Sequence, residues 1–154
     1  PERVTKLCLM SANPEAPTAK QLETWATWQQ DIREGKFNDI IQGFTNNVHP
    51  KKRTDPKLCE TILRMAHDTG PETFMTQLQA LASRIDSRPH LHAIHCPTLL
   101  MVGKQDTVTP LEFHLEIQTL IPESRLIPIE DCGHYLTLEQ PQTVTALLRY
   151  WLQS

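Results

Sequence analysis

The segment from Cys96 to Pro141 constrains the fold of this chain more than any other part. It contains two short apolar runs, Thr98–Gly103 and Arg125–Ile129, and each run ends at a turn with one titratable side chain. Asp106 follows the first run and His134 follows the second. A helix-length stretch separates the runs, which predicts parallel neighbours in one sheet covered on both faces. An acid and a base would then meet at the carboxyl ends of adjacent strands.

Asp106 and His134 are candidates for an acid–base pair. An imidazole titrates near neutral pH, so it can take a proton from a nucleophile and return it to a leaving group. A carboxylate that accepts the other ring N–H would fix the tautomer. The alternatives are an Asx turn or helix cap for Asp106 and an ordinary turn hydrogen bond for His134. Gly133 is expected to let the chain turn sharply before the histidine.

Two other acidic residues compete with Asp106 for a role near His134. Asp131 stands so close to the histidine along the chain that a cap or an ion pair is the preferred interpretation. Glu139 precedes Pro141, so we expect it near a helix start and outside the site.

No convincing nucleophile accompanies this pair. The pentapeptide G-x-S-x-G, which places a serine on a strained strand-to-helix turn, is missing from the sequence. Ser11 follows an apolar run, but its neighbours Met10 and Ala12 are not the glycines that such a turn requires. Cys132 is only two residues from His134, too near for in-line geometry. We expect the nucleophile to come from outside this chain.

The composition of the 154 residues suits one globular domain and excludes several classes of protein. A net charge of −3 gives no signature of nucleic-acid binding, and the basic run at 51–53 is expected to be a solvated loop. No apolar run is long enough to span a membrane. The four cysteines lack C-x-x-C spacing, which favours buried free thiols and a cytoplasmic location.

The amino-terminal part predicts one strand and then a helical insert. Val4–Met10 follows Pro1-Glu2-Arg3 without an initiator methionine, so we expect a chain cut from a longer one. Its strand would leave an unpaired edge beside which more sheet belongs. Apolar spacing predicts helices that begin after Thr18, at Phe37, after Asp55 and after Gly70, and later ones over Pro110–Ile121 and Pro141–Leu152. The side chains expected to face inward include Met65, Ile85 and Leu115.

A dense group of histidines raises a metal-site hypothesis. His90, His92, His95 and Cys96 could supply zinc ligands. No second ligand cluster accompanies them, and the segment runs straight into the strand Thr98–Gly103. The preferred interpretation is a solvated loop, with no metal and no cofactor.

The order of motifs resembles the C-terminal part of α/β-hydrolase fold proteins. The motifs are I-x-C-P-T-L-L-M-V-G-x-x-D-x-x-T-P and R-L-I-P-I-E-D-C-G-H-x-x-x-x-E-x-P. The nearest branch holds 3-oxoadipate enol-lactonases and meta-cleavage-product hydrolases. The resemblance is strong over Ile94–Pro141 and loose over the helical insert. It implies a doubly wound, mostly parallel α/β-hydrolase sheet, of which three strands are visible, with a four-helix cap insertion.

The resemblance also implies roles for particular positions. Val4–Met10, Thr98–Val102 and Arg125–Ile129 would be the sixth, seventh and eighth strands, with Asp106 as the acid and His134 as the base. The first five strands, the oxyanion-hole loop and the nucleophile turn have no counterpart here. The implied domains are a core strand at 1–12, a helical cap at 13–88 and the C-terminal half of the core at 89–154.

A cap over a hydrolase site would shape an apolar pocket for a small substrate. The candidate substrate-binding residues are Met10, Ser11, Trp25 and Phe74. The alternative for the aromatic residues is ordinary packing between helices, which explains most of them.

Two functions from different classes follow. The first is a hydrolase of a small ester, lactone or related C–C bond substrate, in which this chain alone is inactive because the nucleophile is absent. The second is a non-catalytic, truncated hydrolase-like module that acts through its cap or sheet edge. Its partner would be the missing N-terminal half or a second copy.

Overall fold

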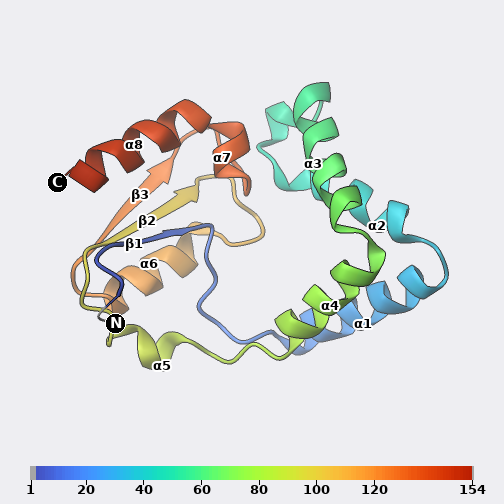
Figure 1. Ribbon diagram of the computed structural model, residues 1–154, viewed down its shortest axis with the longest axis horizontal. Helices are drawn as coiled ribbons and strands as arrows, with labels where there is room; N and C mark the ends of the chain where they lie inside the picture. The colour runs from blue at the N-terminus through green and yellow to red at the C-terminus, as the bar shows by residue number, and fades with distance from the viewer. Residues whose placement is uncertain (1–2, 154) are drawn as a thin grey trace. The chain divides into compact units, whose positions relative to one another are not determined.

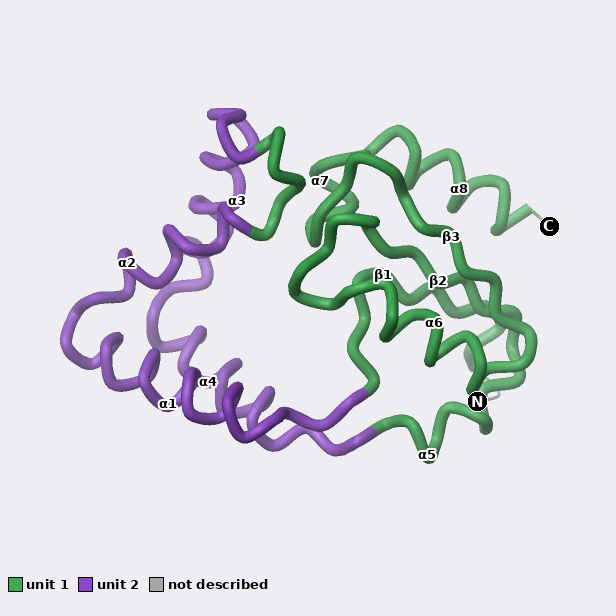
Figure 2. The backbone as a smooth tube through the Cα atoms, turned by 180° about the vertical axis from the view of Figure 1, so that it is seen from behind, with its two compact units in different colours: residues 1–14, 47–52, 87–154 green, residues 15–46, 53–86 purple. Residues whose placement is uncertain are grey.

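A computed structural model describes residues 3–153 of the chain, which form two compact units (Figure 2). Unit 1 comprises 1–14, 47–52 and 87–154, and unit 2 comprises 15–46 and 53–86. Pro1, Glu2 and Ser154 lie outside the described residues. The segment 47–52 belongs to unit 1, although the sequence placed all of 13–88 in one insert. Its hydrogen bonds to the loop around His134, described below, explain this placement.

A three-stranded parallel sheet forms the centre of unit 1 (Figure 1). The strands are β1 (Leu7–Met10), β2 (Thr98–Gly103) and β3 (Ser124–Ile129), and their order in the sheet is β1-β2-β3. In this register Leu7 lies opposite Thr98, and Thr98 lies opposite Ser124. The parallel sheet with helices between its strands confirms the predicted fold class.

Helices cover both faces of the sheet. Figure 1 shows α8 (Pro141–Gln153) and α6 (Leu111–Leu120) on opposite sides of it. Every residue of the central strand β2 is buried, as its unbroken apolar sequence requires. The core on the α8 side contains Leu99, Met101, Ile129, Cys132, Leu136, Val144 and Trp151. The core on the α6 side contains Leu100, Ile117 and Ile121.

The first strand is shorter than the sequence predicted. It begins at Leu7 instead of Val4, and the Val4 side chain is 50% exposed. Lys6, just before the strand, contacts the end of α8. Its ammonium group donates to the carbonyl oxygens of Trp151 at 2.9 Å and Leu152 at 3.1 Å. A cation there satisfies the last carbonyls of α8 and complements the helix dipole.

Helix α6 turns a different face inward from the one that the sequence predicted. Leu115 is 47% exposed, whereas His114 is fully buried. The His114 Nε2 accepts the Ala12 N–H at 2.9 Å, and its Nδ1 lies 3.3 Å from the Pro110 carbonyl oxygen. Both ring nitrogens therefore have partners, which permits a buried imidazole. Burial lowers the pKa of His114 and so favours the neutral ring.

Unit 2 consists of helices with predictable starts. They are α1 (Ala19–Arg33), α2 (Phe37–Gln42), α3 (Pro56–Thr69) and α4 (Pro71–Ala82). Thr18 caps α1 in a capping box with Gln21, and Asp55 caps α3, so both helices begin where the sequence predicted. Their core contains Ile32, Phe37, Ile41 and Leu78, with Trp25, Trp28, Phe44 and Phe74 packed against it.

Two apolar side chains of unit 2 were wrongly predicted to face inward. Met65 is 51% exposed on α3, and Ile85 is 69% exposed beyond the end of α4 at Ala82. The helical spacing continues past the actual helix end, so it cannot locate that end.

Short helical turns complete the chain. They are η1 (Gly43–Asn47), η2 (Pro50–Lys52), α5 (Arg88–Leu91) and α7 (Leu136–Glu139). None of the helices within residues 3–153 combines the length and the apolar character that crossing a bilayer needs.

Candidate active site

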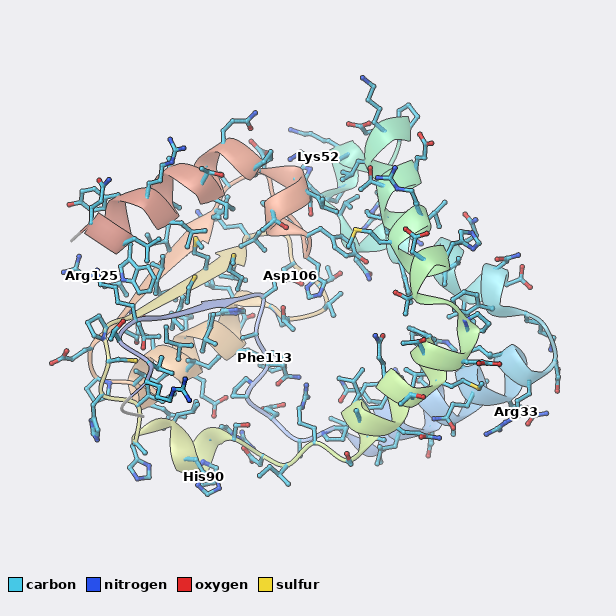
Figure 3. All side chains as sticks on the ribbon, viewed as in Figure 1. Arg33, Lys52, His90, Asp106, Phe113 and Arg125 are labelled. Atoms are coloured by element: carbon cyan, nitrogen blue, oxygen red, sulfur yellow. The ribbon has the colours of Figure 1, made fainter. Side chains whose placement is uncertain are left out.

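Asp106 and His134 lie at the carboxyl ends of β2 and β3. Asp106 stands three residues past the end of β2, and His134 stands five residues past the end of β3. Figure 3 shows Asp106 at this end of the sheet and Arg125, near the start of β3, at the other end. The carboxyl ends of parallel strands share one edge, where ligands bind in open α/β sheets.

The two side chains are in direct contact. His134 Nδ1 lies 2.9 Å from Asp106 Oδ2. An ionised carboxylate can only accept, so the hydrogen must be on Nδ1, and Nε2 of the neutral ring has a free lone pair. The Asp106 side chain is completely buried, whereas that of His134 is 25% exposed. In this geometry the carboxylate can hold the imidazole in one orientation.

The Asp106 carboxylate also closes a tight turn. Its Oδ1 accepts the N–H groups of Val108 and Thr109, both at 2.9 Å. Its Oδ2 accepts the Thr109 hydroxyl at 2.8 Å beside the bond from His134. The Asp106 side chain therefore closes the turn and also contacts the His134 imidazole, and its role as a catalytic acid stays a prediction. The turn holds the carboxylate in place independently of the histidine.

These hydrogen bonds determine the ionisation of Asp106. Burial by itself would raise the pKa of this carboxyl group. The hydrogen bond from His134, those from Thr109 and the attraction of the His134 charge outweigh burial and lower the pKa to about 2. Asp106 is therefore an anion throughout the neutral range.

The Asp106→Asn substitution is expected to reduce stability in a way that depends on pH. A carboxyl group with a lowered pKa stabilises the fold above its ordinary pKa, and that contribution is lost as the pH falls from about 4 to about 2. We expect the variant to be less stable by about 2 kcal/mol at pH 7. Urea denaturation followed by circular dichroism at pH 7 and pH 2 measures this difference. A difference that is equally large at pH 2 would contradict the assignment.

The loop around His134 is held by its main chain. The His134 N–H donates to the Asn47 carbonyl oxygen at 2.8 Å, and its carbonyl oxygen accepts the Ser11 hydroxyl at 3.0 Å. Gly133, just before His134, was predicted to permit a sharp turn, but the structure gives a different reason for a glycine at this position. It is not among the residues with positive φ, but a Cβ there would lie 2.6 Å from backbone atoms of residues 47–49. Close approach of another segment, not a sharp turn, requires glycine.

Glu139 lies just before the start of α8, as expected, and its carboxylate also binds the loop around His134, which the sequence did not predict. It ends α7, and its side chain is buried beneath the loop, with the residue 7% exposed. Its Oε2 accepts the N–H groups of His49 at 2.8 Å and Gly133 at 3.0 Å. Its Oε1 accepts the Tyr135 N–H at 3.2 Å. The spacing G-H-x-x-x-x-E was the only sequence signal of this role.

The other polar candidates near His134 have structural partners. Asp131 Oδ1 lies 3.6 Å from His49 Nε2, so the carboxylate is close to this imidazole, and the predicted ion pair would require the ring to be protonated. Cys132 is buried, and burial followed by the charge of Glu139 raises the pKa of its thiol to about 12. A thiol that remains protonated is a poor nucleophile. Ser11 has the left-handed φ of 46° and uses its hydroxyl hydrogen in the bond to His134.

The four predicted substrate-binding residues are divided between the two units. Met10 ends β1 with 37% exposure, and Ser11 follows it at the same end of the sheet as His134. Trp25 and Phe74 belong to unit 2, where both pack against its core. The Phe74 ring centroid lies 5.8 Å from that of Phe37 and 5.7 Å from that of Phe44. Packing accounts for Phe74, and contact with a substrate stays a prediction for all four.

The histidine-rich segment leads into β2. His90 lies on the short helix α5, and His92 ends it (His90 is labelled in Figure 3). Within residues 3–153, no three side chains of histidine, cysteine, aspartate or glutamate are grouped so that they could hold a metal ion.

The sheet order, the flanking helices and the acid–base pair at the carboxyl edge define the C-terminal part of an α/β-hydrolase fold. The family model described as Ndr family matches residues 1–154. The chain therefore belongs to the Ndr family.

Known proteins resemble this chain over most of its length. AB hydrolase superfamily protein YisY of Bacillus subtilis is 28% identical over 163 residues, which cover 98% of this chain and 58% of YisY. The structure of a thermophilic esterase from Thermogutta terrifontis matches with a TM-score of 0.91 at 28% identity, over 98% of this chain and 56% of the esterase. The enol-lactonase from Burkholderia xenovorans LB400 shares the fold at 17% identity, with a TM-score of 0.87 over 99% of this chain and 58% of the lactonase. The chain spans less than two thirds of each.

Proposed function

We propose that this chain supplies the acid and base of an α/β-hydrolase acting on a small ester, lactone or related C–C bond substrate. The observation that supports this most is the 2.9 Å contact between His134 Nδ1 and Asp106 Oδ2 at the carboxyl edge of the sheet. The resemblance to an esterase and to an enol-lactonase supports the substrate class. The nucleophile would come from polypeptide outside these 154 residues.

In the proposed reaction, His134 Nε2 takes the proton of the nucleophile as that group attacks the carbonyl carbon. The imidazolium gives this proton to the leaving group as its bond to the carbonyl carbon breaks. Nε2 then takes a proton from a water molecule that attacks the acyl group, and it returns that proton to the nucleophile as the acyl bond breaks. Asp106 accepts the Nδ1–H throughout and stabilises the positive ring. Unit 2, with its aromatic core, would act as the cap that the family resemblance implies.

The coding sequence on the amino-terminal side of Pro1 tests this proposal. We expect a G-x-S-x-G motif, or its aspartate counterpart, within about 40 residues upstream. The polypeptide that includes it should hydrolyse p-nitrophenyl esters, whereas the 154-residue chain alone should not. Rapid hydrolysis by the isolated chain that depends on both Asp106 and His134 would contradict a nucleophile from outside.

A second candidate function is favoured by the edge of β1. Among residues 3–153, β1 pairs with β2 on one side and has no strand on the other. A hollow of about 490 Å³ lined by Val4, Leu7 and residues 93–96 adjoins this strand. A non-catalytic module could pair here with a second copy of the chain. Size-exclusion chromatography with light scattering should then give a dimer, and a monomer at every concentration tested would contradict pairing.

A further inference from the structure

We call residues 132–135 the histidine loop. The backbone N–H groups of Gly133, His134 and Tyr135 all donate to acceptors outside this loop. The Gly133 N–H donates to Glu139 Oε2 at 3.0 Å, and the Tyr135 N–H donates to Glu139 Oε1 at 3.2 Å. The His134 N–H between them donates to the Asn47 carbonyl oxygen at 2.8 Å. The backbone on both sides of the imidazole is therefore bound by one carboxylate.

The same carboxylate also binds the segment that receives the His134 amide. Glu139 Oε2 accepts the His49 N–H at 2.8 Å, so it joins this amide and that of Gly133 at one oxygen atom. Gly133 has no room for a Cβ because the backbone of residues 47–49 lies against it. Glu139 therefore connects the histidine loop to a segment 90 residues away in the sequence.

These contacts require that both Oε1 and Oε2 of Glu139 accept hydrogen bonds. Three N–H groups converge on the two oxygens, and an ionised carboxylate offers acceptors only. A glutamine would turn its NH₂ group toward one of these donors. The Lys52 ammonium donates to the Glu139 carbonyl oxygen at 2.7 Å, which brings a positive charge close to the buried anion.

We propose that Glu139 is a positioning residue for His134: its carboxylate fixes the backbone of the histidine loop so that the imidazole meets Asp106. Glu139 acts through the loop and does not itself touch the reacting groups. This role deepens the proposed hydrolase function and rests on it. Asp106 is held separately by Val108 and Thr109, so loss of the Glu139 carboxylate displaces only one member of the pair.

Hydrogen exchange in the unaltered chain gives the first test, which needs no variant. The Gly133 and Tyr135 amides should exchange slowly, with protection similar to that of the amides in β2. Rapid, unprotected exchange at both positions would overturn the proposal, because the carboxylate would then not hold the loop.

The Glu139→Gln variant gives the second test, with Glu130→Gln as the matched control. Glu130 follows β3 and pairs with Lys104, and its side chain is 71% exposed. In Glu139→Gln, the Gly133 and Tyr135 amides should exchange faster by about tenfold or more. The proton resonance of the His134 Nδ1–H should also broaden or vanish in spectra of the folded protein, and Glu130→Gln should leave both unchanged.

A purely structural role for Glu139 predicts a different outcome. Glu139→Gln would then lower the melting temperature but leave the His134 Nδ1–H resonance in place, which would overturn the proposal. If Glu139→Gln does not fold, the exchange rates of the unaltered chain still decide. None of these measurements depends on hydrolysis. They can therefore contradict the positioning role of Glu139 without contradicting the proposed hydrolase function, and a failure of the hydrolase function would not by itself contradict the positioning role.

Discussion

The Gly103→Ala substitution is expected to destabilise unit 1 by about 3 kcal/mol or more. Gly103 is the last residue of β2, and a Cβ there would lie 2.1 Å from the Gly133 carbonyl oxygen and 2.4 Å from that of Cys132. Both obstacles are backbone atoms of the histidine loop, so no side-chain rotation relieves the overlap. The loop would have to move away from the strand that precedes Asp106. Urea denaturation followed by circular dichroism measures the loss of stability.

Gly43→Ala is the matched control for this experiment. Gly43 has a right-handed helical backbone with φ −61°, and no heavy atom lies within 4 Å of a Cβ placed there. An alanine at such a site stabilises a protein by up to about 1 kcal/mol, since it restricts the unfolded chain. If Gly103→Ala unfolds at the same urea concentration as the unaltered chain, the close approach of the histidine loop to β2 is wrong.

The second large effect concerns catalysis and rests on the proposed function. In the polypeptide that also carries the nucleophile, His134→Ala is expected to lower kcat by about 10⁴- to 10⁶-fold. The reason is that no other group accepts the proton of the nucleophile. Asp106→Asn should lower kcat by about 10⁴-fold, because the ring loses the acceptor that fixes its tautomer. Initial rates with p-nitrophenyl esters measure both effects.

His90→Ala serves as the control for these kinetics. His90 is exposed on α5 and does not contact Asp106 or His134 in any of the interactions described. Its removal should leave kcat unchanged. Substantial turnover in His134→Ala, within about tenfold of the unaltered protein, would exclude the proposed base.

The sequence predicted the elements whose causes are local. The strand at Thr98–Gly103 was predicted with its observed bounds, because a short apolar run between two turns is typical of a buried strand. The starts of α1 and α3 were predicted from Thr18 and from the pair Asp55-Pro56, whose effects act within one turn of helix. The contact between Asp106 and His134 could also be expected, since parallel strands deliver their ends to one edge.

The features that the sequence did not predict depend on partners far away in the chain. On α6, His114 faces inward and accepts the Ala12 N–H. The spacing of apolar residues gives no information about such a hydrogen bond. Gly133 is glycine because residues 47–49 pack against it. Glu139 is buried because its donors include His49. The contacts of Gly133 and Glu139 both involve the segment 47–52, which is distant from them in the sequence.

The most direct test of this site is to determine which nitrogen of the His134 ring carries the hydrogen. In the chain labelled with ¹⁵N-histidine, long-range proton–nitrogen spectra above pH 7 distinguish a protonated Nδ1 from a protonated Nε2. We predict that Nδ1 bears the hydrogen, that its proton resonance lies far downfield because it is bonded to the Asp106 carboxylate, and that Asp106→Asn abolishes this signal. A ring with its hydrogen on Nε2, or a spectrum that Asp106→Asn leaves unaltered, would show that the carboxylate does not orient the imidazole.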